Sequence, residues 1–170
     1  LYVQSIYNKN DQLKTFHKLL IPFILAGILG FLAPQLLGSG DTLVDLLIEG
    51  KLTALMIVAL LVGKFAFAII CFGSGAPGGI FFPLFVIGCL IGGLFGIFAV
   101  NFLNLDPNYI NNFILLAMAG YFTAIVRAPV TGIILIFEMT GSLSHLHPIT
   151  TVSIIAYIVA DLLKSKPISE

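Results

Sequence analysis

The segment of this chain best suited to chemistry is Gly75–Pro83, which reads GAPGGIFFP. Glycine lets another group approach the main chain closely, and a proline just inside a helix start loses no hydrogen bond. The first N–H groups of a helix have no partner within it and carry the positive end of its dipole. The segment therefore predicts an anion site built from backbone amides, while a merely close-packed helix start is the alternative.

Composition indicates what surrounds this segment. Hydrophobic residues make up 59% of the chain and charged residues 9%, whereas about 25% of a typical soluble domain is charged. The mean hydropathy is +1.10 and the formal net charge is zero. We expect a multi-pass integral membrane protein in a plasma or inner membrane, with the lipid bilayer as a partner and no nucleic acid.

The apolar segments predict an all-α membrane protein. Three are long enough to cross a bilayer: Leu19–Leu37, Leu52–Phe72 and Ile80–Leu103. Three equally apolar but shorter ones predict half-helices: Phe113–Val126, Val130–Thr140 and Pro148–Leu163. Leu43–Ile48 predicts another short re-entrant element. Tilted, broken and re-entrant helices indicate transport, because irregular backbone inside a membrane is tolerated only in protein or beside a wet cavity.

Four glycines recur in the third long segment, at Gly88, Gly92, Gly93 and Gly96. Their spacing places most of them on one helix face, where a neighbouring helix can pack closely.

Three charged residues interrupt apolar segments: Lys64, Arg127 and Glu138. Each would cost about 2.5–3.5 kcal/mol if it faced lipid, so we expect all three to face protein. Lys64 and Arg127 could raise the positive potential along an anion path. The alternative is a structural role, in which they pair with Glu138, other carboxylates or free carbonyls at helix ends. Glu138 is predicted to be a structural anchor rather than a proton carrier.

Other reactive residue types give weaker signals. His145 and His147 lack further metal ligands nearby, so a loop role is favoured and no metal site is predicted. Cys71 and Cys89 lie in apolar runs and are interpreted as small buried hydrophobes. Since no nucleophile–base pair lies on facing segments, we do not expect an enzyme, and no cofactor is predicted.

Three blocks in order resemble the CLC family of chloride channels and proton-coupled chloride transporters. They are GSGAPGGIFFP at 73–83, RAPVTG at 127–132 and FEMT at 137–140. A fourth, KPI at 166–168, resembles the family segment that enters the last membrane helix. The likeness extends over nearly the whole chain.

The resemblance implies that residues 1–170 are the C-terminal half of a CLC-type transmembrane domain, a fragment without its N-terminal half. In that family the two halves form an inverted repeat that encloses the anion path, and chloride is the substrate. The resemblance also implies a homodimer, with Val130–Thr140 and Pro148–Leu163 near its interface. A channel and a chloride/proton antiporter both remain open, and a degenerate or structural half-transporter is the alternative function.

The resemblance also implies site residues. Gly79, Ile80, Phe81 and Phe82 match the helix start whose backbone amides, chiefly those of Ile80 and Phe81, are similar to chloride ligands. Ser169 stands where the family has a tyrosine, and could donate a shorter hydroxyl to the inner anion site. Ser74 is not assigned the family's serine role, since that motif belongs to the absent half. No residue here resembles the gating glutamate.

Overall fold

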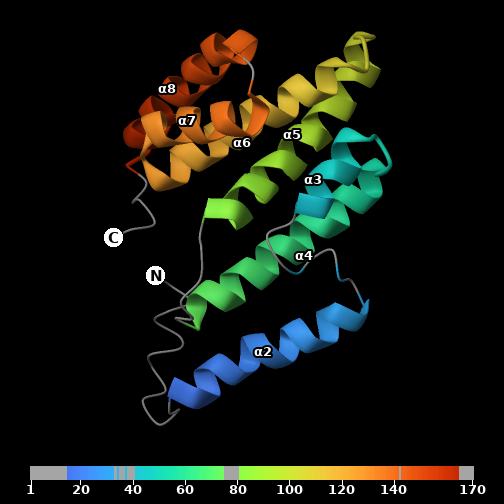
Figure 1. Ribbon diagram of the computed structural model, residues 1–170, viewed down its shortest axis with the longest axis vertical. Helices are drawn as coiled ribbons and strands as arrows, with labels where there is room; N and C mark the ends of the chain where they lie inside the picture. Colours follow the sequence, from blue (N-terminus) through green and yellow to red (C-terminus); the bar gives the residue numbers. More distant parts are fainter. Residues whose placement is uncertain are drawn as a thin grey trace.

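The computed structural model describes residues 15–32, 34, 37, 41–74, 81–141 and 143–164, and all its elements are helical. In chain order they are α2 (Thr15–Leu32), α3 (Asp41–Ile48), α4 (Ala54–Gly73), α5 (Phe81–Leu103), α6 (Tyr109–Val126), α7 (Pro129–Thr140), the 3-10 turn η2 (Leu143–His145) and α8 (Leu146–Leu162) (Figure 1). The predicted all-α class is confirmed.

The described residues include four helices that are long and apolar enough to cross a membrane. Their apolar windows are Ala54–Cys71, Phe82–Leu103, Tyr109–Val126 and Leu143–Leu162. The first two confirm the predicted spans in α4 and α5, and the 12-residue α7 confirms the predicted half-helix.

The predictions of half-helices in α6 and α8 are wrong. α6 begins at Tyr109 and has 18 residues, while η2 and α8 together form a 20-residue apolar stretch. The sequence reading excluded polar residues such as Asn112 and His147, which the first helical turn accommodates without ending the helix. Conversely, α2 ends at Leu32, before the predicted end at Leu37.

α5 is the most enclosed of the four long helices, with 61% of its apolar window buried. It packs mainly against α6, and α6 packs in turn against α8. The rings of Phe85 and Phe122 stack between α5 and α6 with centroids 4.7 Å apart, and Leu90 and Met118 are buried in the same core. α5 is thus held along its length by the rest of the fold.

Glycines allow this close contact. A Cβ at Gly88, Gly92 or Gly96 would meet α6, whereas one at Gly93 would meet Leu47 of α3. The prediction that most of these glycines share a helix-packing face is confirmed, since three of the four face α6.

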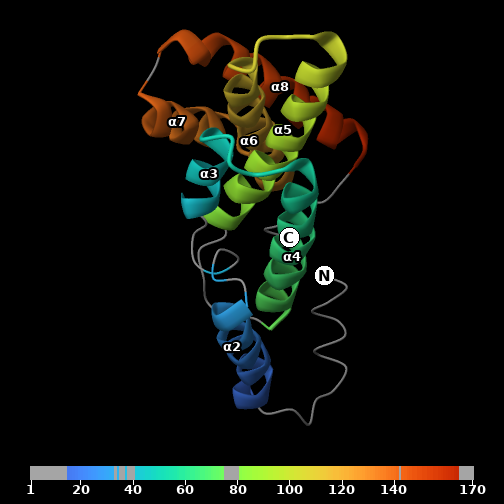
Figure 2. The same ribbon diagram turned by 90° about the vertical axis from the view of Figure 1, so that its right-hand side faces the viewer.

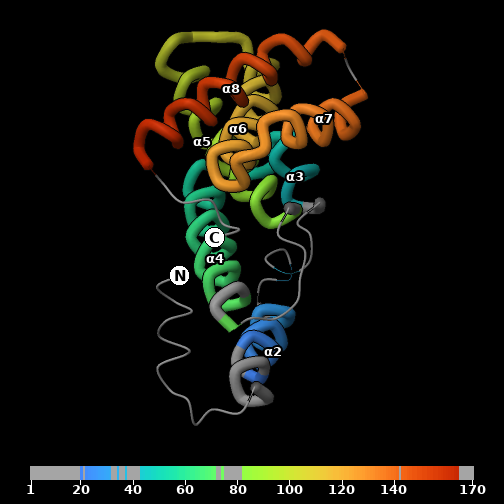
Figure 3. Tube along the Cα trace, turned by 90° about the vertical axis from the view of Figure 1, so that its left-hand side faces the viewer, coloured from blue at the N-terminus to red at the C-terminus, as the bar shows by residue number. Residues whose placement is uncertain are grey.

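The helices lie in two groups. α2 lies at the lower end of the molecule and α6, α7 and α8 lie at the upper end (Figures 1 and 2), a separation that the view from the opposite side repeats (Figure 3). α4 and α5 run in opposite directions between these ends (Figure 1). The side chains of Phe23 and Phe31 on α2 are largely exposed.

We predict that the substitution Gly92→Ala lowers the free energy of unfolding by about 1–3 kcal/mol, because overpacking forces neighbouring atoms apart. The added Cβ would lie 2.7 Å from both the carbonyl oxygen of Phe113 and the Cβ of Ala117. Thermal unfolding of the purified protein in detergent measures the effect.

The matched control is Gly27→Ala in α2, where an added Cβ meets nothing within 4 Å. There we expect a small gain in stability, up to about 1 kcal/mol, because alanine favours a helix over glycine. Equal effects of the two substitutions would contradict the assigned packing role of Gly92.

Candidate functional site

The predicted anion site lies at the start of α5. Gly79 and Ile80 fall outside the described residues, and α5 begins at Phe81, followed by Phe82 and Pro83 in its first turn. The side chain of Phe82 is 50% exposed. Amides in a first helical turn have no carbonyl partner within the helix, and Pro83 has no N–H to satisfy. A helix start therefore lies where the glycine-rich sequence predicts one.

Lys64 lies on the face of α4 that is turned toward the protein. Its exposure is 2%, and Ile57, two helical turns earlier on the same face, is fully buried in the core. The expectation that Lys64 avoids lipid is confirmed. Its influence on an anion remains a prediction.

Ser74 closes the end of α4. Its hydroxyl donates a 2.7 Å hydrogen bond to the carbonyl oxygen of Cys71, one turn earlier in the same helix. This bond gives Ser74 a local role at a helix end.

Arg127 lies at the break between α6 and α7. Its backbone is left-handed, with φ 61° and ψ 26°, and its N–H donates a 2.9 Å bond to the carbonyl oxygen of Thr123. Ala128 precedes Pro129, and a residue before proline is disfavoured in the helical region. Together these two residues end α6 and let Pro129 start α7.

The guanidinium of Arg127 reaches the far end of α8. Nη1 donates to the carbonyl oxygen of Tyr157 at 3.3 Å, and Nη2 donates to that of Ala160. Nη1 also lies 3.5 Å from Oδ1 of Asp161, and the Tyr157 ring centroid is 5.7 Å from Cζ. The carboxylate that pairs with Arg127 is thus that of Asp161.

Of the other predicted site residues, the structure describes Glu138. Glu138 is exposed on α7 within this chain, and its role as a structural anchor stays a prediction. Its side chain points away from the helix bundle because the core face of α7 is formed by Gly132 and Ile136. Ser169 lies outside the described residues.

The histidines do not form a metal site with other residues that the structure describes. His145 is in η2 and His147 is exposed at the start of α8, and no group of three metal-binding side chains occurs in the described part of the chain.

Sequence reasoning missed two participants at the α6–α7 break. Thr123 is fully buried, and a Cβ added at Gly132 of the RAPVTG block would lie 3.0 Å from its Oγ1. Asp161 is the acidic partner of Arg127. The glycine in the block could have indicated a close contact, but nothing local in the sequence connects Arg127 with Asp161.

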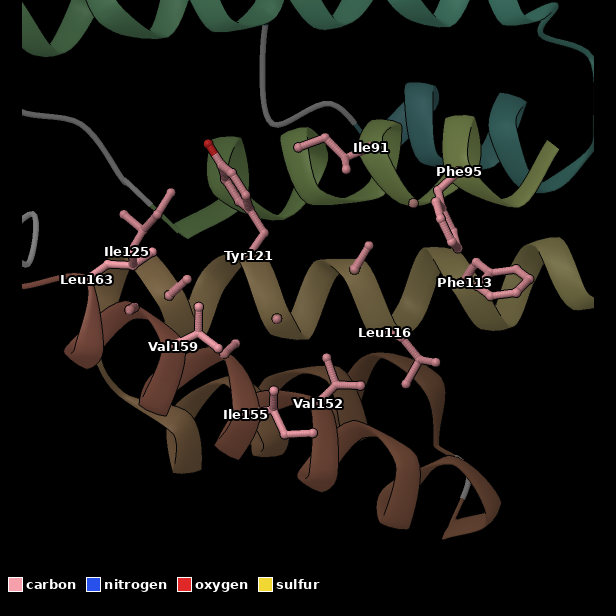
Figure 4. Close-up of a pocket in the computed structure, with 16 residues that line it drawn as sticks. Ile91, Phe95, Phe113, Leu116, Tyr121, Ile125, Val152, Ile155, Val159 and Leu163 are labelled. Carbon is pink, nitrogen blue, oxygen red and sulfur yellow. The ribbon is translucent and has the colours of Figure 1, made fainter. Parts of the chain in front are cut away.

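A large apolar cavity lies elsewhere in the described part of the chain. It is a groove of about 750 Å³ between α5, α6 and α8, lined along its length by residues such as Phe95, Leu116 and Val159 (Figure 4). Tyr121 contributes the one polar side-chain group of this lining. Because its walls are apolar, the groove suits hydrocarbon side chains and not an ion.

Comparison with known proteins gives the family. The family model described as voltage gated chloride channel matches residues 1–161. The chain is similar to proteins named H(+)/Cl(-) exchange transporter ClcA: 39% identical over 167 residues in Vibrio campbellii, 37% over 168 in Vibrio cholerae serotype O1 and 38% over 167 in Vibrio parahaemolyticus. Each alignment covers 95% of this chain but only 34% or 35% of the relative.

The chain therefore spans about a third of the length of the relatives it matches. The family match covers almost all of its residues, and four of its described helices have the length and apolarity of membrane spans. On this evidence, the chain belongs to the voltage-gated chloride channel family of integral membrane proteins.

Proposed function

We propose that the protein containing this chain carries chloride across a membrane, and that backbone amides at the start of α5 hold the ion during its passage. The observation that carries the proposal is the beginning of α5 at Phe81, directly after the Gly78-Gly79-Ile80 run. Family membership supports chloride as the substrate.

Backbone amides suit an ion that must also leave. A helix start offers about half a positive charge, spread over several N–H groups, whereas a lysine or arginine side chain offers a full charge. Conduction requires binding that offsets dehydration without trapping the ion. Glycine at position 79 leaves the amides of Ile80 and Phe81 open to approach.

The relatives favour proton-coupled exchange over a passive channel. All of those named above are H(+)/Cl(-) exchange transporters by name. We therefore propose an antiporter, with the channel as the second candidate.

This chain is proposed to act only as part of the larger fold. It corresponds to about a third of the relatives' length, and the apolar groove between α5, α6 and α8 is open within it. We propose that an N-terminal half supplies the other side of the anion path, so that residues 1–170 alone do not transport.

A homodimer is also proposed, through the outer faces of α7 and α8. Large apolar side chains are exposed there, including Val130 and Ile134 on α7 and Ile154 on α8. Both helices match segments that lie near the dimer interface in the family that the chain resembles.

The first prediction concerns the amide of Phe81. Replacing Phe81 by proline removes this N–H at the first residue of α5, a position where proline is compatible with a helix. We expect chloride binding to weaken by about tenfold or more, the loss of one hydrogen bond to a charged group. Isothermal titration of the full polypeptide in detergent measures the dissociation constant.

Phe81→Ala is the control for this variant, because it shortens the side chain and keeps the amide. Its chloride affinity should stay within about twofold of wild type, a change well below one such hydrogen bond. Equal losses in the proline and alanine variants would show that the side chain, and not the amide, matters.

The second prediction concerns access to the amides. Gly79→Val should weaken chloride binding more than it weakens folding, because a β-branched side chain blocks approach to the main chain. Gly27→Val is the control, since Gly27 has no neighbour within 4 Å of an added Cβ. Unchanged chloride affinity in Gly79→Val would contradict the site.

The third prediction separates exchange from passive flow. In vesicles reconstituted with the full polypeptide, an imposed proton gradient should drive chloride uphill, and chloride flux should carry protons in the opposite direction. A pH electrode and a chloride electrode measure both. Chloride flux without proton movement would identify a channel, and absence of flux would favour a degenerate transporter.

A further inference from the structure

The apolar groove between α5, α6 and α8 adjoins a second cavity that is more polar. This second cavity has a volume of about 440 Å³ and lies at the starts of α6 and α8. Phe113 and Leu116 line both cavities, so the polar one begins where the groove ends. Phe113 lies at one end of the groove, and Ile125 and Leu163 lie at the other (Figure 4). An apolar groove and a polar cavity are therefore placed end to end.

The polar cavity lies where two membrane-crossing segments begin. The apolar window of α6 starts at Tyr109, and that of η2 with α8 starts at Leu143. The side chains of Tyr109 and Ser144, from the two starts, both line the cavity. The two windows thus begin at the same membrane surface, and the groove extends from there toward the middle of the bilayer.

The side chains of the polar cavity suit a lipid head group. Tyr109, Asn112, Ser144 and His145 all form hydrogen bonds, and Asn112 and His145 are half-buried. Among the described residues that line the cavity there is no lysine or arginine, and the exposed Asp106 lies one turn before Tyr109. An anionic head group would find no cation here, whereas a zwitterionic one can place its phosphate near the donors and its amine near Asp106.

The dimensions of the groove suit an acyl chain. α6 rises about 18 Å between Phe113 and Ile125, at 1.5 Å per residue. One leaflet contributes about 15 Å to the hydrocarbon core of a bilayer. The volume of about 750 Å³ is in the range of sites for small molecules. A chain that enters from the membrane surface can therefore follow the groove to the depth of its own leaflet.

We propose that the groove and the polar cavity together bind one phospholipid with a zwitterionic head group, and that one of its acyl chains lies in the groove. Contact with hydrocarbon alone favours no position in a bilayer, because lipid tails are as apolar as leucine. Hydrogen bonds in the polar cavity hold this lipid in place, and the groove sets the path of its chain. The bound lipid stabilises the folded arrangement of α5, α6 and α8, independently of chloride transport.

The first test identifies the lipid that the full polypeptide retains. The purified protein in detergent is mixed with equal amounts of phosphatidylethanolamine, which is zwitterionic, and phosphatidylglycerol, which is anionic, and native mass spectrometry counts the bound molecules. We expect one phosphatidylethanolamine per copy of the chain, retained about tenfold more than phosphatidylglycerol. Absence of any retained phospholipid would overturn the proposal and indicate that another helix or a second copy fills the groove. Equal retention of both would overturn the assigned head-group chemistry.

A pair of neighbouring histidines tests the polar cavity. His145→Phe removes a hydrogen-bonding side chain from the lining, and retention of phosphatidylethanolamine should fall by about tenfold. His147→Phe is the matched control, because His147 is exposed at the start of α8 and lies outside the lining. Its retention should stay within about twofold of wild type, well below the loss of one hydrogen bond. Equal effects of the two substitutions would contradict a head-group site at this cavity.

The second test examines the groove in a bilayer. Vesicles of phosphatidylglycerol that contain the full polypeptide receive phosphatidylethanolamine with a photoreactive diazirine in one acyl chain, and mass spectrometry maps the labelled residues. We expect labelling at groove residues such as Ala124 and Ala156. Excess unlabelled phosphatidylethanolamine should reduce it by about tenfold, whereas further phosphatidylglycerol should not. Equal displacement by both lipids would show non-specific contact with the bilayer and overturn the site.

A variant that fills the groove completes this test. Ala124→Phe places a large ring in the groove and should lower the displaceable labelling of Ala156 by about tenfold. Val62→Phe is the control, since Val62 is 62% exposed on α4, away from the groove. Equal labelling of Ala156 in the two variants would overturn the assigned path of the chain. If Ala124→Phe does not fold, the displacement measured with wild-type protein still decides whether the groove holds a specific lipid.

Discussion

The constraint on which this structure depends is that a helix that ends inside a membrane must find partners for its last backbone groups. The chain meets it in different ways at different ends. The hydroxyl of Ser74 bonds back to Cys71 at the end of α4, and that of Thr140 bonds back to Ile136 at the end of α7. At the end of α8, Leu163 and Lys164 donate backbone bonds to Val159 and Asp161, and Arg127 from the α6–α7 break donates to the carbonyl of Ala160. At the start of α5, we propose that the partner is the transported ion.

An anion site of this kind requires a helix that does not shift when the ion enters or leaves. α5 is the most buried of the long helices, and it is held by α6 along a face of three glycines. Glycine brings the two backbones close together, so that dispersion contacts and shape hold them in the absence of a hydrophobic driving force between membrane helices. The stacked rings of Phe85 and Phe122 add a contact within the first turns of α5. Packing along α5 therefore supports the binding that we propose at its start.

The sequence predicted features that depend on local chemistry. Composition indicated a membrane protein, the glycine-rich block located the start of α5, and Pro129 with Gly141 bounded α7. The prediction of helix length failed at the starts of α6 and α8. Asn112 and His147 make these first turns less apolar, but the turns are still helical. The sequence offered carbonyls at helix ends as partners of Arg127, but it could not identify that of Ala160, which is 33 residues away and meets Arg127 because α6 and α8 pack together. Long-range partners of this kind leave no periodic pattern in a single sequence.

The proposed anion site relies on partial charges at a helix start and not on the full charge of Arg127. A full positive charge on an ion path would hold chloride too firmly for turnover. The charge of Arg127 is shared between two carbonyl oxygens and the carboxylate of Asp161, so its attraction for a distant anion is reduced. Under the proposed function, partial charges on the amides at the start of α5 act on the ion instead. The contacts of Arg127 thus join the α6–α7 break to α8, whereas we propose that the weaker dipoles at the start of α5 bind the ion.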